Sequence, residues 1–113
     1  MADVVYINEE EGKKRVMNNN KLYVKLLTKF KTETKLDDLI NFADDEEWEK
    51  AQSAAHTIKG IAANLSLTEL FNKALEIETQ IKSKSLKNDS MENMKACFAE
   101  TLVAVEKVIT QNA

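Results

Sequence analysis

The sequence contains no proline, only two glycines, and a single residue each of cysteine, histidine and tryptophan among its 113 residues. Proline and glycine are the residues that most often interrupt regular backbone, so their scarcity favours long helices over short strands joined by turns. One cysteine cannot form a disulfide within the chain. These absences, together with abundant Ala, Leu, Lys and Glu, predict an all-α protein.

Long apolar runs are also absent, so no membrane-spanning helix is expected. The first six residues lack the basic start and apolar core of a signal peptide, which favours a cytoplasmic protein. The chain carries 16 Lys and Arg against 19 Asp and Glu, a net charge of -3. This balance gives no general attraction for nucleic acid or an anionic membrane surface, so we expect neither contact. The expected partner is another protein.

Apolar spacing predicts a single domain over residues 1–113 with one short helix and four long ones. The expected helices cover about 8–17, 20–43, 45–65, 67–84 and 90–111. Long amphipathic helices joined by short polar turns pack most simply as an antiparallel up-down-up-down four-helix bundle, with the short helix added at its N-terminal side.

Capping residues support several of these boundaries. Asn8, followed by three glutamates, is expected to cap the short helix. Asp44 with Glu47, and Ser66 with Glu69, have the spacing of capping boxes that would open the next two helices. The helix over 45–65 has the clearest apolar face. Its expected members are Trp48, Ala51, Ala55, Ile58, Ala62 and Leu65.

The one histidine, His56, lies on this helix but outside its apolar face. At about 100° per residue it is roughly 130° from the centre of that face, so we expect an exposed imidazole. Lys59 and Gly60 follow at three and four positions and share its surface patch. Glycine inside a helix costs about 1 kcal/mol relative to alanine, and room for a partner to approach the ring would explain it.

A neutral imidazole nitrogen can attack an electrophilic phosphorus atom, and a neighbouring ammonium group favours an incoming phosphoryl anion. We therefore expect His56 to accept a phosphoryl group with electrostatic support from Lys59. Phosphoryl transfer normally needs a metal and a charge clamp, which one lysine does not supply. The chain is accordingly not expected to be a kinase, and its partner should bring the missing groups.

The segment from Ala55 to Leu65, Ala-His-Thr-Ile-Lys-Gly-Ile-Ala-Ala-Asn-Leu, resembles the phosphoacceptor motif of histidine-containing phosphotransfer (HPt) domains. Trp48, eight residues before the histidine, is similar to an aromatic residue of many members. The family usually has a second glycine ten residues after the histidine, where this chain has Ser66, expected here to cap the following helix. Further similar positions are Ile7, Glu11, Gly12, Arg15, Asn20, Lys21, Leu22, Tyr23, Leu26, Leu27 and Phe30.

The resemblance implies a monomer that relays a phosphoryl group between receiver-domain aspartates through a phosphohistidine at His56. Its implied partners are response-regulator receiver domains and a hybrid sensor kinase, of which the chain could itself be a piece. We expect Mg²⁺ on the receiver and no cofactor on this chain, because no carboxylate cluster lies beside His56 in the sequence. Counting back from the turn near Asp44 and Asp45 puts Thr32 and Glu33, in the polar stretch Lys31 to Lys35, at about the level of His56. The expected partner contacts are Gln52, Gly60, Ala63, Asn64 and Thr32.

Three other functions share parts of this sequence pattern. A di-iron bundle requires Glu-x-x-His pairs, and the residue three before His56 is Ser53. A Cys-His hydrolase would need Cys97 to approach His56, but no activating motif surrounds this cysteine. The remaining alternative is a non-phosphorylated helical adaptor that docks a partner through the same face.

Overall fold

The computed structural model describes residues 5–112, in which all regular secondary structure is helical. Residues 1–4, which enter the expectation about a signal peptide, and residue 113 lie outside the described residues. Within 5–112, no helix combines the length and apolarity needed to cross a membrane. The all-α prediction is confirmed. The helices are α1 (Glu9–Arg15), α2 (Asn20–Glu33), α3 (Asp37–Asp44), α4 (Trp48–Leu65), α5 (Thr68–Lys82) and α6 (Asn88–Gln111).

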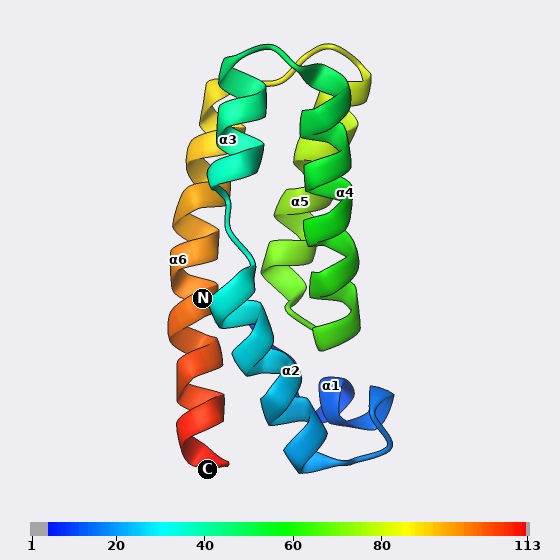
Figure 1. Cartoon of the computed structure of the whole chain (residues 1–113), viewed down its shortest axis with the longest axis vertical. Coiled ribbons are helices and arrows are strands. Elements are labelled where there is room, and N and C mark those ends of the chain that lie inside the picture. Colours follow the sequence, from blue (N-terminus) through cyan, green and yellow to red (C-terminus); the bar gives the residue numbers. More distant parts are fainter. Residues whose placement is uncertain (1–4, 113) are drawn as a thin grey trace.

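Figure 1 shows α4, α5 and α6 as long rods near the long axis of the molecule, while α2 and α3 follow one another along the same direction. α4 packs against α5 and α3, α5 packs against α6, and α2 also contacts α6. The short helix α1 lies at the lower end, in contact with α2 and α4. One apolar core joins these helices. Its fully buried large side chains include Tyr23, Leu27, Leu39, Leu67, Leu70, Ile77, Met94 and Val105.

The predicted continuous helix over 20–43 was wrong, because the structure divides it into α2 and α3. Thr34 leaves helical geometry with a ψ of 124°, and the helix resumes at Asp37. The residues from Lys31 to Lys35 provide no apolar side chain that would hold a helical turn against the core, and β-branched Thr34 favours extended backbone. Leu36 enters the core directly from this break.

One predicted helix start and two predicted capping boxes were also wrong. Asp44 ends α3, and Glu47 precedes α4 without a side-chain capping bond, so α4 begins at Trp48 rather than at residue 45. At this first helical position Trp48 is 40% exposed instead of buried. α5 likewise begins without a side-chain cap. The bounds of α1, α5 and α6 agree with the expected ranges to within two residues, and Asn8 caps α1 as predicted, accepting a bond of 3.1 Å from the N–H of Glu11.

Ser66 ends α4 instead of starting α5. Its φ of 58° is in the left-handed region, where a helix commonly closes its last turn on a glycine. The N–H of Leu67 donates to the carbonyl of Ala62 at 2.8 Å, which completes this closure. The Ser66 hydroxyl donates to Glu11 at 2.9 Å, and the N–H of Asn8 donates to the carbonyl of Ser66 at 2.8 Å. Helix α1 is thus fastened to the end of the helix that carries His56.

Tyr23 makes a second link between the lower end of the molecule and α4. Its side chain is fully buried, and its hydroxyl donates to the carbonyl of Leu65 at 2.9 Å. Burial raises the pKa of this hydroxyl to about 12. The ring lies against Gly12, where an added Cβ would come within 2.6 Å of its Cε1 and Cζ atoms. Glycine is required here by this close approach of α1 to α2.

Candidate functional site

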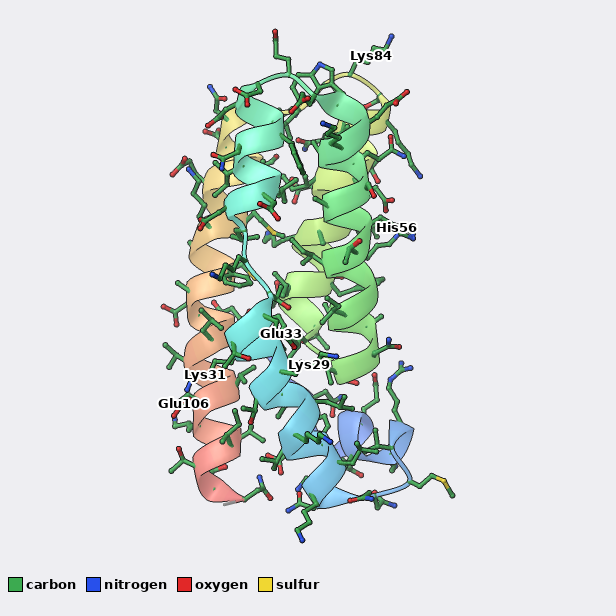
Figure 2. All side chains as sticks on the ribbon, in the orientation of Figure 1. Lys29, Lys31, Glu33, His56, Lys84 and Glu106 are labelled. Atoms are coloured by element: carbon green, nitrogen blue, oxygen red, sulfur yellow. The ribbon has the colours of Figure 1, made fainter. Side chains whose placement is uncertain are left out.

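His56 projects outward from the middle of α4, as predicted (Figure 2). Its side chain is 67% exposed, while Ala55 and Ile58 on the inward face of the same helix are buried. The phase of the helix therefore separates the imidazole from the core and leaves it accessible to another molecule.

Glu78 of α5 is the partner of His56 and was not predicted from the sequence. Its carboxylate is only 4% exposed, with Oε2 at 2.9 Å from Nδ1 of His56 and Oε1 at 2.6 Å from Nζ of Lys59. The packing of α5 on α4 brings these residues together from 22 and 19 positions apart. The sequence contains one indication of this contact, because the acidic residue Glu78 occupies a position on the apolar face of α5, between Ile77 and Ile81.

The buried carboxylate is held in its charged form. The hydrogen bond from Lys59 is the largest cause that lowers the pKa of Glu78 below its usual range. Burial acts in the opposite direction, while the bond to His56 and the charges of Lys59 and Lys82 lower the pKa further. A buried carboxylate without such partners would be costly, so these contacts are what keep an anion beneath the imidazole.

The contact with Glu78 selects the tautomer of His56. A charged carboxylate only accepts hydrogen bonds, so we assign the ring proton to Nδ1. In a neutral imidazole with its proton on Nδ1, the lone pair available for chemistry lies on Nε2. The arrangement therefore presents a nucleophilic nitrogen on an exposed surface and places a negative charge on the opposite side of the ring.

A hollow of about 380 Å³ lies beside the ring. Gln52, which the sequence predicts as a partner contact, lines this hollow. Glu49, Ser53, Glu78 and Lys82 line it as well and were not predicted as site residues. Helical side chains lean toward the N-terminus of their helix, which directs the imidazole toward the turn that carries Gln52. The residues that line the hollow are Glu49, Gln52, Ser53, His56, Glu78 and Lys82.

Gly60 lies on the exposed surface one turn beyond His56. A Cβ built there meets no atom within 4 Å, so no packing contact requires this glycine. Ala63 on the same side is partly buried, and Asn64 is exposed. At Gly60, the surface next to the imidazole is therefore exposed and carries no side chain, as expected from the sequence.

A larger groove of about 1200 Å³ runs along the other side of α4, where α2, α3 and the break between them face it. Asn64 lines this groove, as do Glu33 and Lys35 from the polar stretch, and Ser53 borders both the groove and the hollow. Thr32 lines neither, and its hydroxyl donates to the carbonyls of Thr28 and Lys29 on its own helix. The structure does not bring Thr32 to His56.

Lys31, from the same polar stretch, turns away from the site and pairs with Glu106 of α6 (Figure 2). Cys97 is buried on α6, where its sulfur lies 3.9 Å from the hydroxyl of Thr101. Burial raises the pKa of this thiol. His56 points outward from α4, whereas the sulfur of Cys97 is buried on α6, so the geometry offers no support for a cysteine hydrolase.

Comparison with family models matches the chain to the Hpt domain over residues 25–109. The matched region contains α4 with His56 and α5 with Glu78, and leaves α1 outside. The comparisons with curated proteins and with solved structures gave no match.

Proposed function

Because the chain belongs to the Hpt domain family, whose members carry phosphoryl groups in two-component signalling and are not kinases, we propose that it relays a phosphoryl group between receiver-domain aspartates through His56. The observation that carries this proposal is an exposed imidazole whose Nδ1 is bonded to a buried carboxylate. That pairing leaves the lone pair of Nε2 available for attack.

In the proposed step, the lone pair of Nε2 attacks the phosphorus atom of an aspartyl phosphate. The N–P bond forms as the P–O bond to the aspartate breaks, and that electron pair leaves with the aspartate carboxylate. Nδ1 keeps its proton, so the ring becomes cationic, and Glu78 lies where this positive charge develops. Transfer to a second receiver is the same reaction in reverse.

The receiver supplies the remaining chemistry. Phosphoryl transfer needs a metal and several charges around the phosphorus, and the surface at His56 does not offer that set. We therefore assign Mg²⁺ to the receiver and no cofactor to this chain. Lys59 supports the reaction indirectly, because its ammonium group is bonded to Glu78 and keeps that carboxylate charged.

The proposed docking face surrounds His56 and includes Gln52, Gly60, Ala63 and Asn64. The proposed scaffold is the antiparallel up-down-up-down bundle, in which α2 and α3 together form one member and α1 covers an end. We propose that it acts as a cytoplasmic monomer with receiver domains and a hybrid sensor kinase as partners.

The test is incubation with a phosphorylated receiver domain and Mg²⁺, followed by assay for acid-labile phosphate. Wild type is expected to take up the label, and His56→Ala is expected to take up none while its melting temperature stays the same, because exposed side chains change stability by less than about 0.5 kcal/mol. Acid-labile phosphate on His56→Ala would refute the assignment. A stable complex without transfer would support the adaptor function instead.

A further inference from the structure

The donating half of the proposed relay depends on the proton at Nδ1 of His56. When a receiver carboxylate attacks the phosphorus atom, the N–P bond breaks and its electron pair returns to Nε2. If Nδ1 still carries its proton, the leaving group is a neutral imidazole. If that proton has been lost, the leaving group is an imidazolate anion, which departs far more slowly. A phosphorylated ring is therefore ready for transfer only while Nδ1 is protonated.

Glu78 is the group that can hold this proton. Its Oε2 lies 2.9 Å from Nδ1, and its side chain is 4% exposed, so little water reaches the contact from that side. Within residues 5–112, Nδ1 has no other hydrogen-bond partner. The bond from Lys59 lowers the pKa of Glu78 and keeps the carboxylate charged. An anion bonded to Nδ1 favours the cationic form of the ring over the neutral form.

The other charged groups near the imidazole act on this proton less directly. Lys59 and Lys82 oppose Glu78, but Nζ of Lys59 is bonded to the other oxygen, Oε1, and Nζ of Lys82 is 4.0 Å from Oε2 on a side chain that is 58% exposed. Glu49 lines the hollow at an exposed position, where solvent screens its charge. Within residues 5–112, no titratable side chain of α1, α2, α3 or α6 lines this hollow. The direct contact with Glu78 therefore has the largest effect.

We propose that Glu78 keeps the phosphorylated imidazole protonated at Nδ1, and so keeps the phosphoryl group transferable at a pH where phosphohistidine in an unfolded chain has lost that proton. This inference rests on the proposed function and assigns Glu78 as a positioning residue for the donating step. The carboxylate lies beneath the ring, so it acts through the imidazole and not on the phosphorus atom. In the accepting step the same contact leaves Nε2 unprotonated, and one carboxylate thus serves both directions of transfer.

NMR spectroscopy of the phosphorylated protein tests this inference. Potassium phosphoramidate supplies the phosphoryl group without a receiver: Nε2 attacks its phosphorus atom, the N–P bond to His56 forms, and the P–N bond of the reagent breaks with loss of ammonia. Imidazole ¹⁵N shifts then report the proton on Nδ1 as the pH is raised. In folded wild type this proton should be lost about one to two pH units higher than in wild type unfolded in urea, the equivalent of one hydrogen bond to a charged group.

Two variants separate the contact with Glu78 from the general charge of the hollow. Glu78→Gln removes the anion and should abolish the difference between the folded and unfolded titrations. Above both titration midpoints, wild type should lose its phosphoryl group to water about ten- to hundredfold faster than Glu78→Gln, because the rate follows the protonated fraction of the ring. Glu49→Gln is the matched control. It removes the same charge from the same hollow without touching Nδ1, so both readouts should equal those of wild type.

Equal titration of the folded and unfolded wild type would overturn the inference, and this comparison requires no variant to fold. A shift by Glu49→Gln as large as that by Glu78→Gln would also overturn it, because the contact would then not be the cause. The same holds if phosphoramidate labels Nδ1 or does not label His56, since Nε2 would not be the free nitrogen. A protein labelled at Nε2 that exchanges phosphoryl groups with no receiver would refute the relay function and leave the role of Glu78 measurable.

Discussion

Replacing Glu78 with glutamine keeps the shape of the site but changes what it can bond. The carboxylate accepts from Nζ of Lys59 through one oxygen and from Nδ1 of His56 through the other. A glutamine side chain has one acceptor and one donor group. Lysine can only donate, so we expect the amide oxygen to turn to Lys59 and the NH₂ group to donate to Nδ1 of His56.

This reversal moves the ring proton to Nε2, so that the lone pair that attacks phosphorus in the proposed step is no longer available. A hydrogen bond to a charged group contributes about 1.5–3 kcal/mol, and about 1.4 kcal/mol corresponds to tenfold in rate. Glu78→Gln should therefore slow phosphoryl acceptance about ten- to hundredfold. The tautomer can be read from imidazole ¹⁵N shifts in a two-bond NMR correlation. A variant that keeps the proton on Nδ1 and transfers at the wild-type rate would refute the reasoning.

The same variant has a pH signature in stability. Since the pKa of Glu78 is lowered in the fold, its contribution to the free energy of unfolding is present above the usual value of 4.5 and is lost as pH falls through the lower folded value. We expect wild type to exceed Glu78→Gln by about 1–2 kcal/mol in urea unfolding at pH 7, and this margin to shrink below about pH 4.5. An equal margin at pH 3 and pH 7 would show that Glu78 is not held as an anion.

Two further substitutions separate docking from folding. Gly60→Gln should stabilise the protein by about 0.5–1 kcal/mol, because the position is open and glycine loses more backbone entropy than other residues on folding, yet it should slow transfer from a receiver. A raised melting temperature with an unchanged transfer rate would show that Gly60 is not part of the docking face. Gly12→Ala should destabilise the protein by about 1–3 kcal/mol in urea unfolding, since its methyl group overlaps the buried ring of Tyr23. Wild-type stability of Gly12→Ala would show that α1 does not pack on α2 as described.

The outward position of His56 could be predicted because helical phase is a local property. Ala55 and Ile58 fix the inward face of α4, and the histidine then follows from geometry alone. The contact with Glu78 could not be predicted in this way, because it depends on how far α5 is shifted along α4. The acidic residue on the otherwise apolar face of α5 could have indicated a buried partner, but not which one.

Two failures had local causes. Thr32 was placed level with His56 by counting along one straight helix, and the break after Glu33 removes the basis of that count. The spacing from Ser66 to Glu69 matches a capping box, but the same serine closes α4 with a left-handed φ of 58°, so that buried Leu67 precedes α5. A capping box is recognised from residue spacing alone. Here the burial of Leu67 in the core determines the direction in which the chain leaves α4.

Because Glu78 is buried, the residues that would contact a receiver differ from the residue that would set the stability of the phosphohistidine. In the proposed relay, a receiver contacts only exposed residues such as Gly60, whereas the carboxylate of Glu78, which would stabilise the cationic ring, is 4% exposed and lies beneath it. Substitutions on the outer surface can therefore change which receivers bind without altering how readily the phosphoryl group leaves. A change at Glu78 or Lys59 would shift the transfer equilibrium for every receiver by the same factor, so partner choice and direction of flow can be adjusted independently in this fold.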